Sequence, residues 1–470
     1  MIDDILSPVR LLLGLASLMA LGYGPVAFLG AQAPESPLTE RLALSFGVGA
    51  VLATLGMLGL SSIGIPFSLP VILIPLLGVS GAALLSNRVR NTVAADLASL
   101  ISKPKLSLRG WEWLWLALLA ALFLFASLRA TLYPLWAWDA LATWGFKGKV
   151  FYLRRALNFT GFEAHNYYPN LLPLLLTYLY LWLGQVNDRL VNGLFPFWGA
   201  LLLLLFYRLL RRLHLTRPAA LGLTAFLALN GATFIDHLTI AYADLPLAYF
   251  ALGAAGFLFL WLKGLAPQGS LALTAWFCAG LAWCKYEGPP LAGTVVLAAA
   301  LTLLWLRPPR LGRQLAALLF PLTGLVLGVL PWRLFAAYHH LEMGSDHILH
   351  FFPHQFWQAL PQVLLGLVNP VFFGVLWPTA ALALLVMGRT LFSTPRLFLA
   401  LFLGGNLLAL VLAYALAPCS TAEFPFYIRG TLDRLLLHLS PIAGLLVGEG
   451  WKESGSDRWS QNPFCRSTAV

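Results

Sequence analysis

The chain has 470 residues, of which 59% are hydrophobic and only 10% are charged, and its mean hydropathy is +0.79. Soluble domains carry about 25% charged residues, so this composition excludes an ordinary soluble protein. The net charge of +11 does not indicate nucleic-acid binding, because basic loops of membrane proteins face anionic lipid. Repeated apolar runs of roughly 20 residues predict an all-α, polytopic membrane protein.

The N-terminal part is expected to contribute three helices, near residues 9–30, 42–61 and 66–85. A basic loop follows, Asn87–Gly110, in which the only acid is Asp96. Positive charge collects in cytoplasmic loops, so this loop is expected inside. A helix from Trp111 to about Ala130 then carries the chain to the outer face.

A large first outer loop is expected at residues 131–189. Within it, Asp139 lies among tryptophans and is followed by four cations, Lys147, Lys149, Arg154 and Arg155. The apolar run Leu171–Gly184 has about 14 residues, too few for a hydrocarbon core about 30 Å thick. It therefore predicts an interfacial or re-entrant helix within the loop. The four cations leave the opposite insertion open, although long loops weigh less in the positive-inside rule.

Further spans are expected at residues 190–210, 218–233, 245–262, 271–283, 291–306, 315–336, 360–387, 397–417 and 435–448. This gives about 13 spanning helices with the N-terminus outside. The chain divides into residues 1–110 (additional N-terminal helices and the basic loop), 111–310 (a core with outer loop 131–189), 311–450 (C-terminal helices with a His-rich outer loop, 337–356) and 451–470 (a polar tail).

Several acids and bases on the expected outer face allow two interpretations each, one functional and one structural. Asp139 fits a general base in partly apolar surroundings, or the N-cap of a helix over Ala140–Leu157. Asp244, two residues before Pro246, fits a helix N-cap that could also bind substrate. Lys285 and Glu287 fit a mutual ion pair at a helix end, or a phosphate-binding lysine beside its acid.

Other polar groups are also ambiguous. Lys147 and Arg154 are seven residues apart and share a helix face, which suits either a phosphate or the headgroup region. Asp236 and His237 fit interfacial polarity or a metal pair. In the His-rich loop, His347 and His350 can meet one ligand. No complete metal-ligand set has a familiar spacing, so no cofactor is expected, and a divalent metal remains the open alternative.

The order of several motifs adds a resemblance. They are Asp139 in the first outer loop, Tyr168-Pro169 and Pro173 before the half-length helix, Gly184 and Arg189 before the next span, Arg211-Arg212, Tyr242-Ala243-Asp244, and Gly280 followed by Lys285-Tyr286-Glu287-Gly288. Over about residues 111–310 the chain resembles the GT-C class of membrane glycosyltransferases, particularly the protein mannosyltransferases and the aminoarabinose transferases. Two features depart from that class. Three helices precede the usual first one, and Asp139 lacks a neighbouring second acid, which argues against a metal-assisted mechanism.

The resemblance implies an enzyme of the plasma (inner) membrane that acts on the extracytoplasmic face. It implies a polyprenyl-phosphate-linked sugar donor and an acceptor lipid, glycan or protein. Asp139 would activate the acceptor. The lipid phosphate and substrate would be bound by Lys147, Lys149, Arg154, Tyr168, Asp244, Lys285 and Glu287. Acceptor or sugar contacts would come from Trp138, His165, His237 and His347.

A secondary transporter is the alternative, with Asp139, Asp244 and Glu287 as proton or substrate sites. Transporters usually contain inverted repeats and carry their ionisable groups near the bilayer midplane. This sequence shows no matching halves, and its candidate groups gather at one expected face. The glycosyltransferase is therefore the favoured hypothesis.

Overall fold

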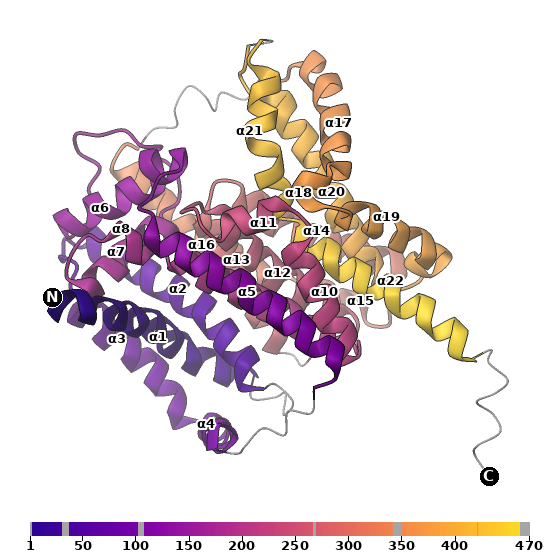
Figure 1. Ribbon diagram of the computed structural model, residues 1–470, viewed down its shortest axis with the longest axis horizontal. Helices are drawn as coiled ribbons and strands as arrows, with labels where there is room; N and C mark the ends of the chain where they lie inside the picture. The colour runs from indigo at the N-terminus through magenta and orange to yellow at the C-terminus, as the bar shows by residue number, and fades with distance from the viewer. Residues whose placement is uncertain are drawn as a thin grey trace.

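The computed structural model describes residues 2–30, 37–101, 108–266, 269–341, 350–420 and 422–460, and within these ranges the protein is helical without strands (Figure 1). Helices satisfy every backbone polar group internally, which a lipid environment requires. The long apolar runs therefore form helices, as the composition predicts.

The N-terminal half comprises α1 (Ile2–Gly30), α2 (Leu38–Ser62), α3 (Leu69–Ala82), α4 (Asn87–Ile101), α5 (Gly110–Leu132), α6 (Gly145–Arg154), α7 (Leu171–Leu183), α8 (Asp188–Val191), α9 (Leu194–Arg212), α10 (Arg217–Leu229) and α11 (Ala232–His237). The C-terminal half comprises α12 (Asp244–Leu262), α13 (Gly269–Cys284), α14 (Gly288–Leu306), α15 (Leu311–Ala317), α16 (Leu319–Tyr338), α17 (Pro353–Val368), α18 (Pro370–Phe373), α19 (Leu376–Met387), α20 (Leu397–Leu416), α21 (Phe424–Leu437) and α22 (Ser440–Ser460). The 3-10 and π-helical turns lie between them.

By length and composition, the described residues contain 8 helices able to cross a membrane, or up to 10 if each bent pair is one span. This confirms an integral membrane protein but not the expected count of about 13. Two expected spans, α10 and α13, have only 13 and 16 residues. The span expected at 360–387 is broken into α17, α18 and α19, since Pro370 and Gly374 interrupt it.

The expected loop Asn87–Gly110 is wrong over its first part, because residues 87–101 form α4, which is bent by 99° from α3. Asp96 anchors this helix: it is buried and accepts a hydrogen bond of 2.8 Å from Arg41 Nε of α2. Tyr23 of α1 also donates to Asp96. A basic stretch with a single acid thus folds back onto the bundle through that acid.

The short helix expected within the loop 131–189 is present as α7, with 13 residues. It lies inside the protein, with nearly every side chain buried among α1, α2 and α6. The Tyr178 hydroxyl lies 2.6 Å from the Ser17 hydroxyl of α1. The helix ends at Gly184, whose φ of 74° suits a residue without a Cβ. The segment between α5 and α9 is therefore held to the core by a buried helix.

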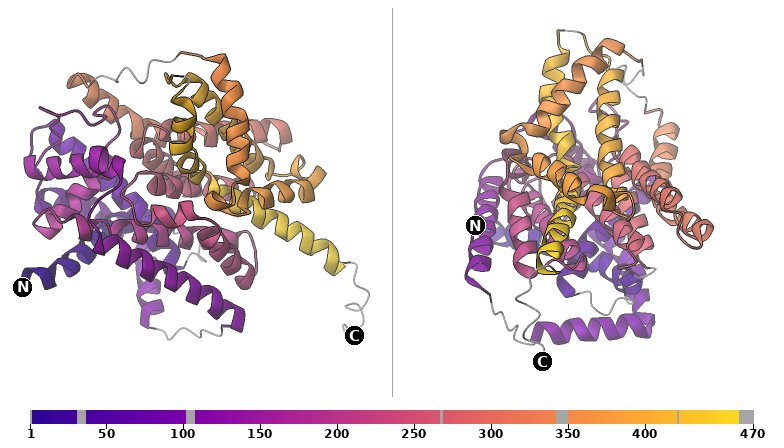
Figure 2. Two further views of the ribbon diagram at one scale, coloured as in Figure 1. Left: turned by 45° about the horizontal axis from the view of Figure 1, so that its top comes forward. Right: turned by 90° about the vertical axis from the view of Figure 1, so that its right-hand side faces the viewer.

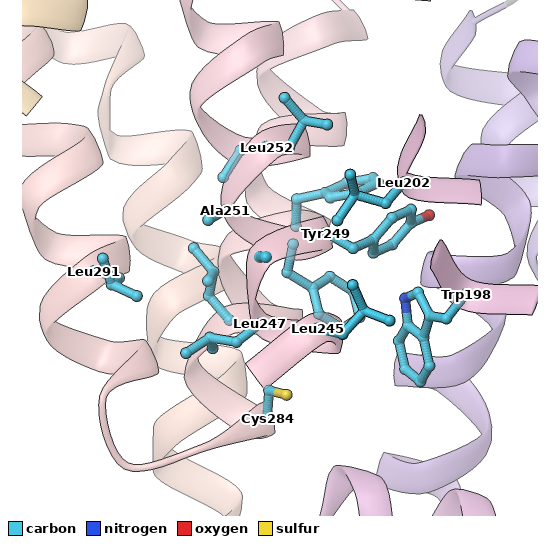
Figure 3. Close-up of a cluster of buried hydrophobic side chains, with 14 of the residues drawn as sticks. Trp198, Leu202, Leu245, Leu247, Tyr249, Ala251, Leu252, Cys284 and Leu291 are labelled. Atoms are coloured by element: carbon cyan, nitrogen blue, oxygen red, sulfur yellow. The ribbon is translucent and has the colours of Figure 1, made fainter. Parts of the chain in front are cut away.

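The centre of the core is α12, in which 89% of the apolar stretch is buried. Figure 3 shows Trp198 of α9 beside Tyr249 and Leu245 of α12, and the ring centroids of Trp198 and Tyr249 are 6.1 Å apart. A Cβ on Gly253 would lie 1.9 Å from the Phe277 ring of α13, so glycine allows these two helices to approach. This packing fixes the position of Asp244, the first residue of α12.

The two ends of the bundle differ in their polar groups. We call the end that carries Asp139 and Asp244 the site end, and the other the opposite end. Three buried acids at the opposite end join helices: Glu40 pairs with Arg212 at 2.7 Å, Glu112 accepts from Arg217 at 2.7 Å, and Glu449 pairs with Lys263 and Arg396 at 2.8 Å. They link α2 to α9, α5 to α10, and α22 to α12 and the start of α20.

The C-terminal helices α17, α20 and α21 stand together and project from the rest of the bundle (Figure 2). From there α21 returns toward the core and continues into α22 with a 50° bend between Leu437 and Ser440. This bend places the last turns of α21, including Arg434 and His438 just after it, beside the start of α12.

Candidate functional site

A buried ionic cluster lies at the site end and draws five residues from four parts of the chain. Asp139 comes from the segment after α5, Asp244 opens α12, and Lys285 and Glu287 lie between α13 and α14. Arg434 comes from α21. Four of these five residues were expected in the site from the sequence, and the fold brings those four together.

Acids and bases alternate along the cluster. Arg434 Nη2 lies 2.6 Å from Asp139 Oδ2 and 3.1 Å from Asp244 Oδ2. Lys285 Nζ lies 2.9 Å from Asp244 Oδ1 and 3.0 Å from Glu287 Oε1. The sequence Asp139–Arg434–Asp244–Lys285–Glu287 is therefore one continuous chain of ion pairs. We call it the ionic chain.

Asp244 is the hub of the ionic chain, and its side chain is fully buried. Besides Arg434 and Lys285, it accepts a hydrogen bond of 2.9 Å from His438 Nε2. The N-cap interpretation of Asp244 is wrong, because the cap position is Ala243 and the carboxylate is used across helices instead. The side chains of Arg434, Lys285 and His438 make four contacts with the carboxylate, two of them from Arg434, and compensate the burial of its charge, as a buried carboxylate requires.

Asp139 sits at the rim of the cluster, with 30% of its side chain exposed. Its N-cap interpretation is also wrong: the carboxylate makes no capping bond to the π-helical turn Ala140–Trp144 that follows. Its backbone N–H donates to the Tyr242 hydroxyl at 3.4 Å. Within the described part of the chain, Oδ2 binds Arg434 and Oδ1 has no partner, so one carboxylate oxygen remains available to a ligand.

Lys285 and Arg434 are held as cations by their surroundings. Burial alone would lower the pKa of Lys285, but Asp244 and Glu287 outweigh it and raise that pKa to about 12. The Arg434 guanidinium lies 4.4 Å from the ring centroid of Tyr242, a cation–π distance. Glu287 Oε2 is buried and has no hydrogen-bond partner among the described residues.

His237 adjoins this cluster and is buried. Its Nδ1 lies 2.8 Å from the Thr233 carbonyl oxygen, which can only accept, so Nδ1 carries the hydrogen. Burial lowers the pKa of His237, with Asp244 offsetting part of the effect, which favours the neutral ring. Nε2 then presents a lone pair, and it has no partner among the described residues.

Aromatic rings connect the outer loop to the ionic chain. Tyr168 stacks on Tyr286, the residue that separates Lys285 from Glu287 in the sequence, and the two ring centroids are 5.8 Å apart. His165 stacks on the same Tyr168 ring at 5.3 Å, and Trp144 approaches it at 5.9 Å. Trp138 is 79% exposed next to Asp139. Planar apolar surfaces of this kind suit the faces of a sugar ring.

The expected cationic face of the outer loop does not form as one surface. Lys147 is fully buried, and its amine donates to the His165 carbonyl at 3.3 Å and lies 5.5 Å from the Trp144 ring. Burial lowers the pKa of Lys147 to about 7, against a smaller opposing effect of Glu163. Lys149 pairs with Asp188 at 2.6 Å, whereas exposed Arg154 donates to Asn158 and to the Thr160 carbonyl.

The remaining candidates lie elsewhere. His347 falls outside the described residues, together with the rest of residues 342–349 of the His-rich loop. In the ranges that are described, no three His, Cys, Asp or Glu side chains are grouped as a metal-ligand set. Asp236 is exposed whereas the neighbouring His237 is buried, and no ion pair joins their side chains among the described residues.

Sequence reasoning missed Arg434 and His438. Arg434 is 190 residues from Asp244 and 295 from Asp139, and the sequence predicts a span only from residue 435 onward. A usable signal was present: Arg434 and His438 are four residues apart, so they lie on one face if the helix begins earlier. A charged face on an otherwise apolar terminal helix indicates a buried partner.

No family model matches the sequence, and the comparisons with curated proteins and with solved structures also give no match. The geometry of the ionic chain and its neighbours therefore carries the functional argument.

Proposed function

We propose that this protein is a membrane glycosyltransferase of the GT-C type. It moves a sugar from a polyprenyl-phosphate-linked donor to an acceptor lipid, glycan or protein on the extracytoplasmic face of the plasma membrane. The observation that carries the proposal is the ionic chain, in which four separately chosen residues meet with Arg434 at one end of an apolar bundle.

The chemistry needs two kinds of group close together. The acceptor hydroxyl requires a base as it attacks the anomeric carbon, and the departing phosphate requires positive charge. The free Oδ1 of Asp139 supplies the base, and Arg434 fixes this carboxylate in place. Lys285 is buried close by and stays protonated, so it supplies positive charge in a site of low dielectric.

The proposed step balances without any cofactor. The acceptor oxygen forms a bond to the anomeric carbon while the bond from that carbon to the phosphate oxygen breaks. The electron pair of the broken bond leaves with the polyprenyl phosphate, and the hydroxyl proton passes to Asp139. His237 Nε2 accepts a hydrogen bond from a second hydroxyl of the bound sugar or acceptor, which gives its unused lone pair a partner.

This proposal includes the finer topology expected from the sequence, with about 13 spans that include the short α10 and α13. A cysteine replacing the exposed His165 should then react with an impermeant thiol reagent in intact cells. The parent protein is the control for its own cysteines, of which Cys278 and Cys284 are buried. Labelling only after permeabilisation would reverse the orientation.

The decisive assay uses purified protein, a polyprenyl-phosphate-linked radioactive sugar and a mixture of acceptor lipids and glycans. Transfer of label to an acceptor supports the proposal. The transporter alternative rests on the same buried charges, which also occur in proton-coupled carriers. In proteoliposomes that alternative predicts proton-driven solute uptake without any covalent transfer, and this result would replace the glycosyltransferase proposal.

A further inference from the structure

A cavity of about 620 Å³ lies against the second half of α5 and the segment that follows it. Its lining residues are Phe125, Leu128, Arg129, Leu132, Tyr133 and Trp136. Cavities that bind small molecules usually measure about 300–1,000 Å³. The lining is apolar and aromatic except for one guanidinium, so an occupant should be mostly apolar with one anionic group.

The helix that forms this cavity is the most lipid-accessible of the apolar spans. Only 17% of the apolar stretch of α5 is buried, compared with 89% in α12. Exposed apolar side chains continue along the helix from the cavity toward its N-terminus, at Leu124, Leu118 and Trp111. A long hydrocarbon chain can lie along this stripe without leaving the membrane.

Arg129 differs from most other cations buried in the bundle. Arg434, Lys285, Lys263 and Arg396 each pair with a carboxylate. Arg129 is half-buried and, within the described residues, has no side-chain partner. A charge in apolar surroundings is costly unless an anion reaches it, and the guanidinium fork fits a phosphate through two parallel hydrogen bonds.

The cavity is structurally connected to the ionic chain. Trp136 lines it, and Asp139 follows three residues later. Asn192 donates to the Ala130 carbonyl at 3.0 Å and to the Thr239 carbonyl at 3.2 Å. This side chain thus ties the end of α5 to the loop that leads into Asp244, so the cavity and the ionic chain keep a fixed relation.

We propose that the lipid-linked donor docks at this cavity before its phosphate reaches Lys285 of the ionic chain, with Arg129 on the phosphate and the polyprenyl chain along the exposed face of α5. The inference rests on the proposed function, because it names where that donor docks. A partner helix is the less suitable occupant, since an apolar helix would cover Arg129 without supplying an anion. A single phosphate on a long polyprenyl tail supplies both the charge and the apolar surface.

The binding test uses the full-length protein in nanodiscs of zwitterionic lipid and a fluorescent polyprenyl monophosphate. We expect Arg129→Gln to weaken binding about 10- to 100-fold, the loss typical of a hydrogen bond between charged groups. Arg129→Lys should recover part of the affinity, because an ammonium keeps the charge but not the fork. Arg333→Gln is the matched control: this exposed arginine on α16 lies outside the cavity lining, and its loss should leave affinity unchanged.

Competition identifies the recognised chemistry. Polyprenol without phosphate, phosphatidic acid and inorganic phosphate should each compete at least tenfold less well than unlabelled polyprenyl monophosphate. Equal competition by phosphatidic acid would overturn the inference, since any anionic lipid would then suffice. Unchanged affinity in Arg129→Gln, or an equal loss in Arg333→Gln, would overturn it as well. The thermal midpoint of Arg129→Gln should match that of the parent, because this side chain has no partner among the described residues to lose.

Transfer measured on the same samples separates the two proposals. If no donor supports transfer but binding depends on Arg129, the glycosyltransferase proposal fails and the lipid-phosphate site stands. If transfer proceeds in Arg129→Gln with an unchanged KM for the donor, the site fails and the glycosyltransferase stands. A raised donor KM with little change in kcat is the result expected when both hold.

Discussion

Both ends of the bundle bury charged groups, but they use them differently. At the opposite end, Glu449 is fully buried between Lys263 and Arg396, and Arg396 also reaches Glu453. At the site end, Asp244 has the same kind of surroundings, yet the outer members of the ionic chain are partly open: the side chains of Asp139 and Glu287 are 30% and 33% exposed.

The difference extends to individual atoms. At the site end, the buried atoms Glu287 Oε2 and His237 Nε2 have no hydrogen-bond partner within the described chain. Oδ1 of the partly exposed Asp139 has none either. At the opposite end, both oxygens of Glu449 accept hydrogen bonds. A buried polar atom without a partner is costly and calls for an explanation. A cluster that keeps several such atoms is suited to binding a ligand, whereas a fully satisfied one is suited to holding helices together.

The largest expected effect concerns the open end of this comparison. Asp139→Asn should lower sugar transfer about 10²- to 10⁴-fold, because an amide cannot take the acceptor proton. The free energy of unfolding should fall by about 1 kcal/mol or less, since Asp139 is at the rim and Arg434 keeps its ion pair with Asp244. Initial rates and thermal midpoints in detergent measure the two quantities. Glu163→Gln, an exposed acid of the same loop, is the control; transfer at the parent rate in Asp139→Asn would remove Asp139 from the reaction.

The next expected effect is on folding at the hub of the ionic chain. Asp244→Asn leaves Lys285 and Arg434 buried with less compensation, so unfolding should become easier by about 3–5 kcal/mol. Denaturant titration in detergent measures this change. The exposed neighbour Asp236 gives the control, since Asp236→Asn should stay within about 0.5 kcal/mol of the parent. A parent-like Asp244→Asn would mean that the ionic chain is not a stabilising contact.

The opposite end provides the contrast. Glu449→Gln removes the acid shared by Lys263 and Arg396, so stability should again fall by about 3–5 kcal/mol. Transfer per folded molecule should stay at the parent value, because no site residue contacts Glu449. Activity divided by the folded fraction, determined by size-exclusion chromatography, tests this. A large loss of specific activity would show that the two ends are coupled and that the distinction drawn above is too simple.

The class of fold follows from the sequence because few backbone structures are stable in a lipid environment. Runs of Leu and Ala without charge must form helices there, and a run as short as Leu171–Gly184 cannot span. Asp139, Asp244, Lys285 and Glu287 could be selected as site candidates because each follows or opens an apolar run. An ionisable group at such a place is either at the interface or in a site.

The remaining features depend on tertiary packing that local patterns do not encode. Arg434 meets Asp244 only because the last turns of α21 pack beside the start of α12, before the 50° bend into α22. Lys147 and Arg154 share a helix face in sequence, but the loop after α6 places its His165 carbonyl over the Lys147 amine alone. The capping interpretation of Asp244 failed because contacts from distant helices outweigh a local hydrogen bond.

Lys147 sharpens the comparison further, because it is a buried cation without an ion pair among the described residues. Its folded pKa, about 7, lies below the ordinary lysine value of about 10.4. Between these two values the unfolded chain binds a proton that the folded protein does not. Stability should therefore rise with pH across this window, by up to about 1.4 kcal/mol per pH unit from this group. Below pH 7 both states are protonated, and the contribution of Lys147 becomes constant.

Lys147→Met tests this contribution by difference. Other groups titrate in the same range, so the quantity to measure is the stability of the variant minus that of the parent, from denaturant titrations at several pH values between about 7 and 10. The variant should be the more stable protein near pH 7, and the difference should shrink as the pH rises. Lys149→Met is the matched control, because Lys149 is paired with Asp188 on the same helix and should show no such trend. A difference that does not vary with pH would mean that the Lys147 amine stays charged inside the protein, and Glu163 would then be its natural counter-ion.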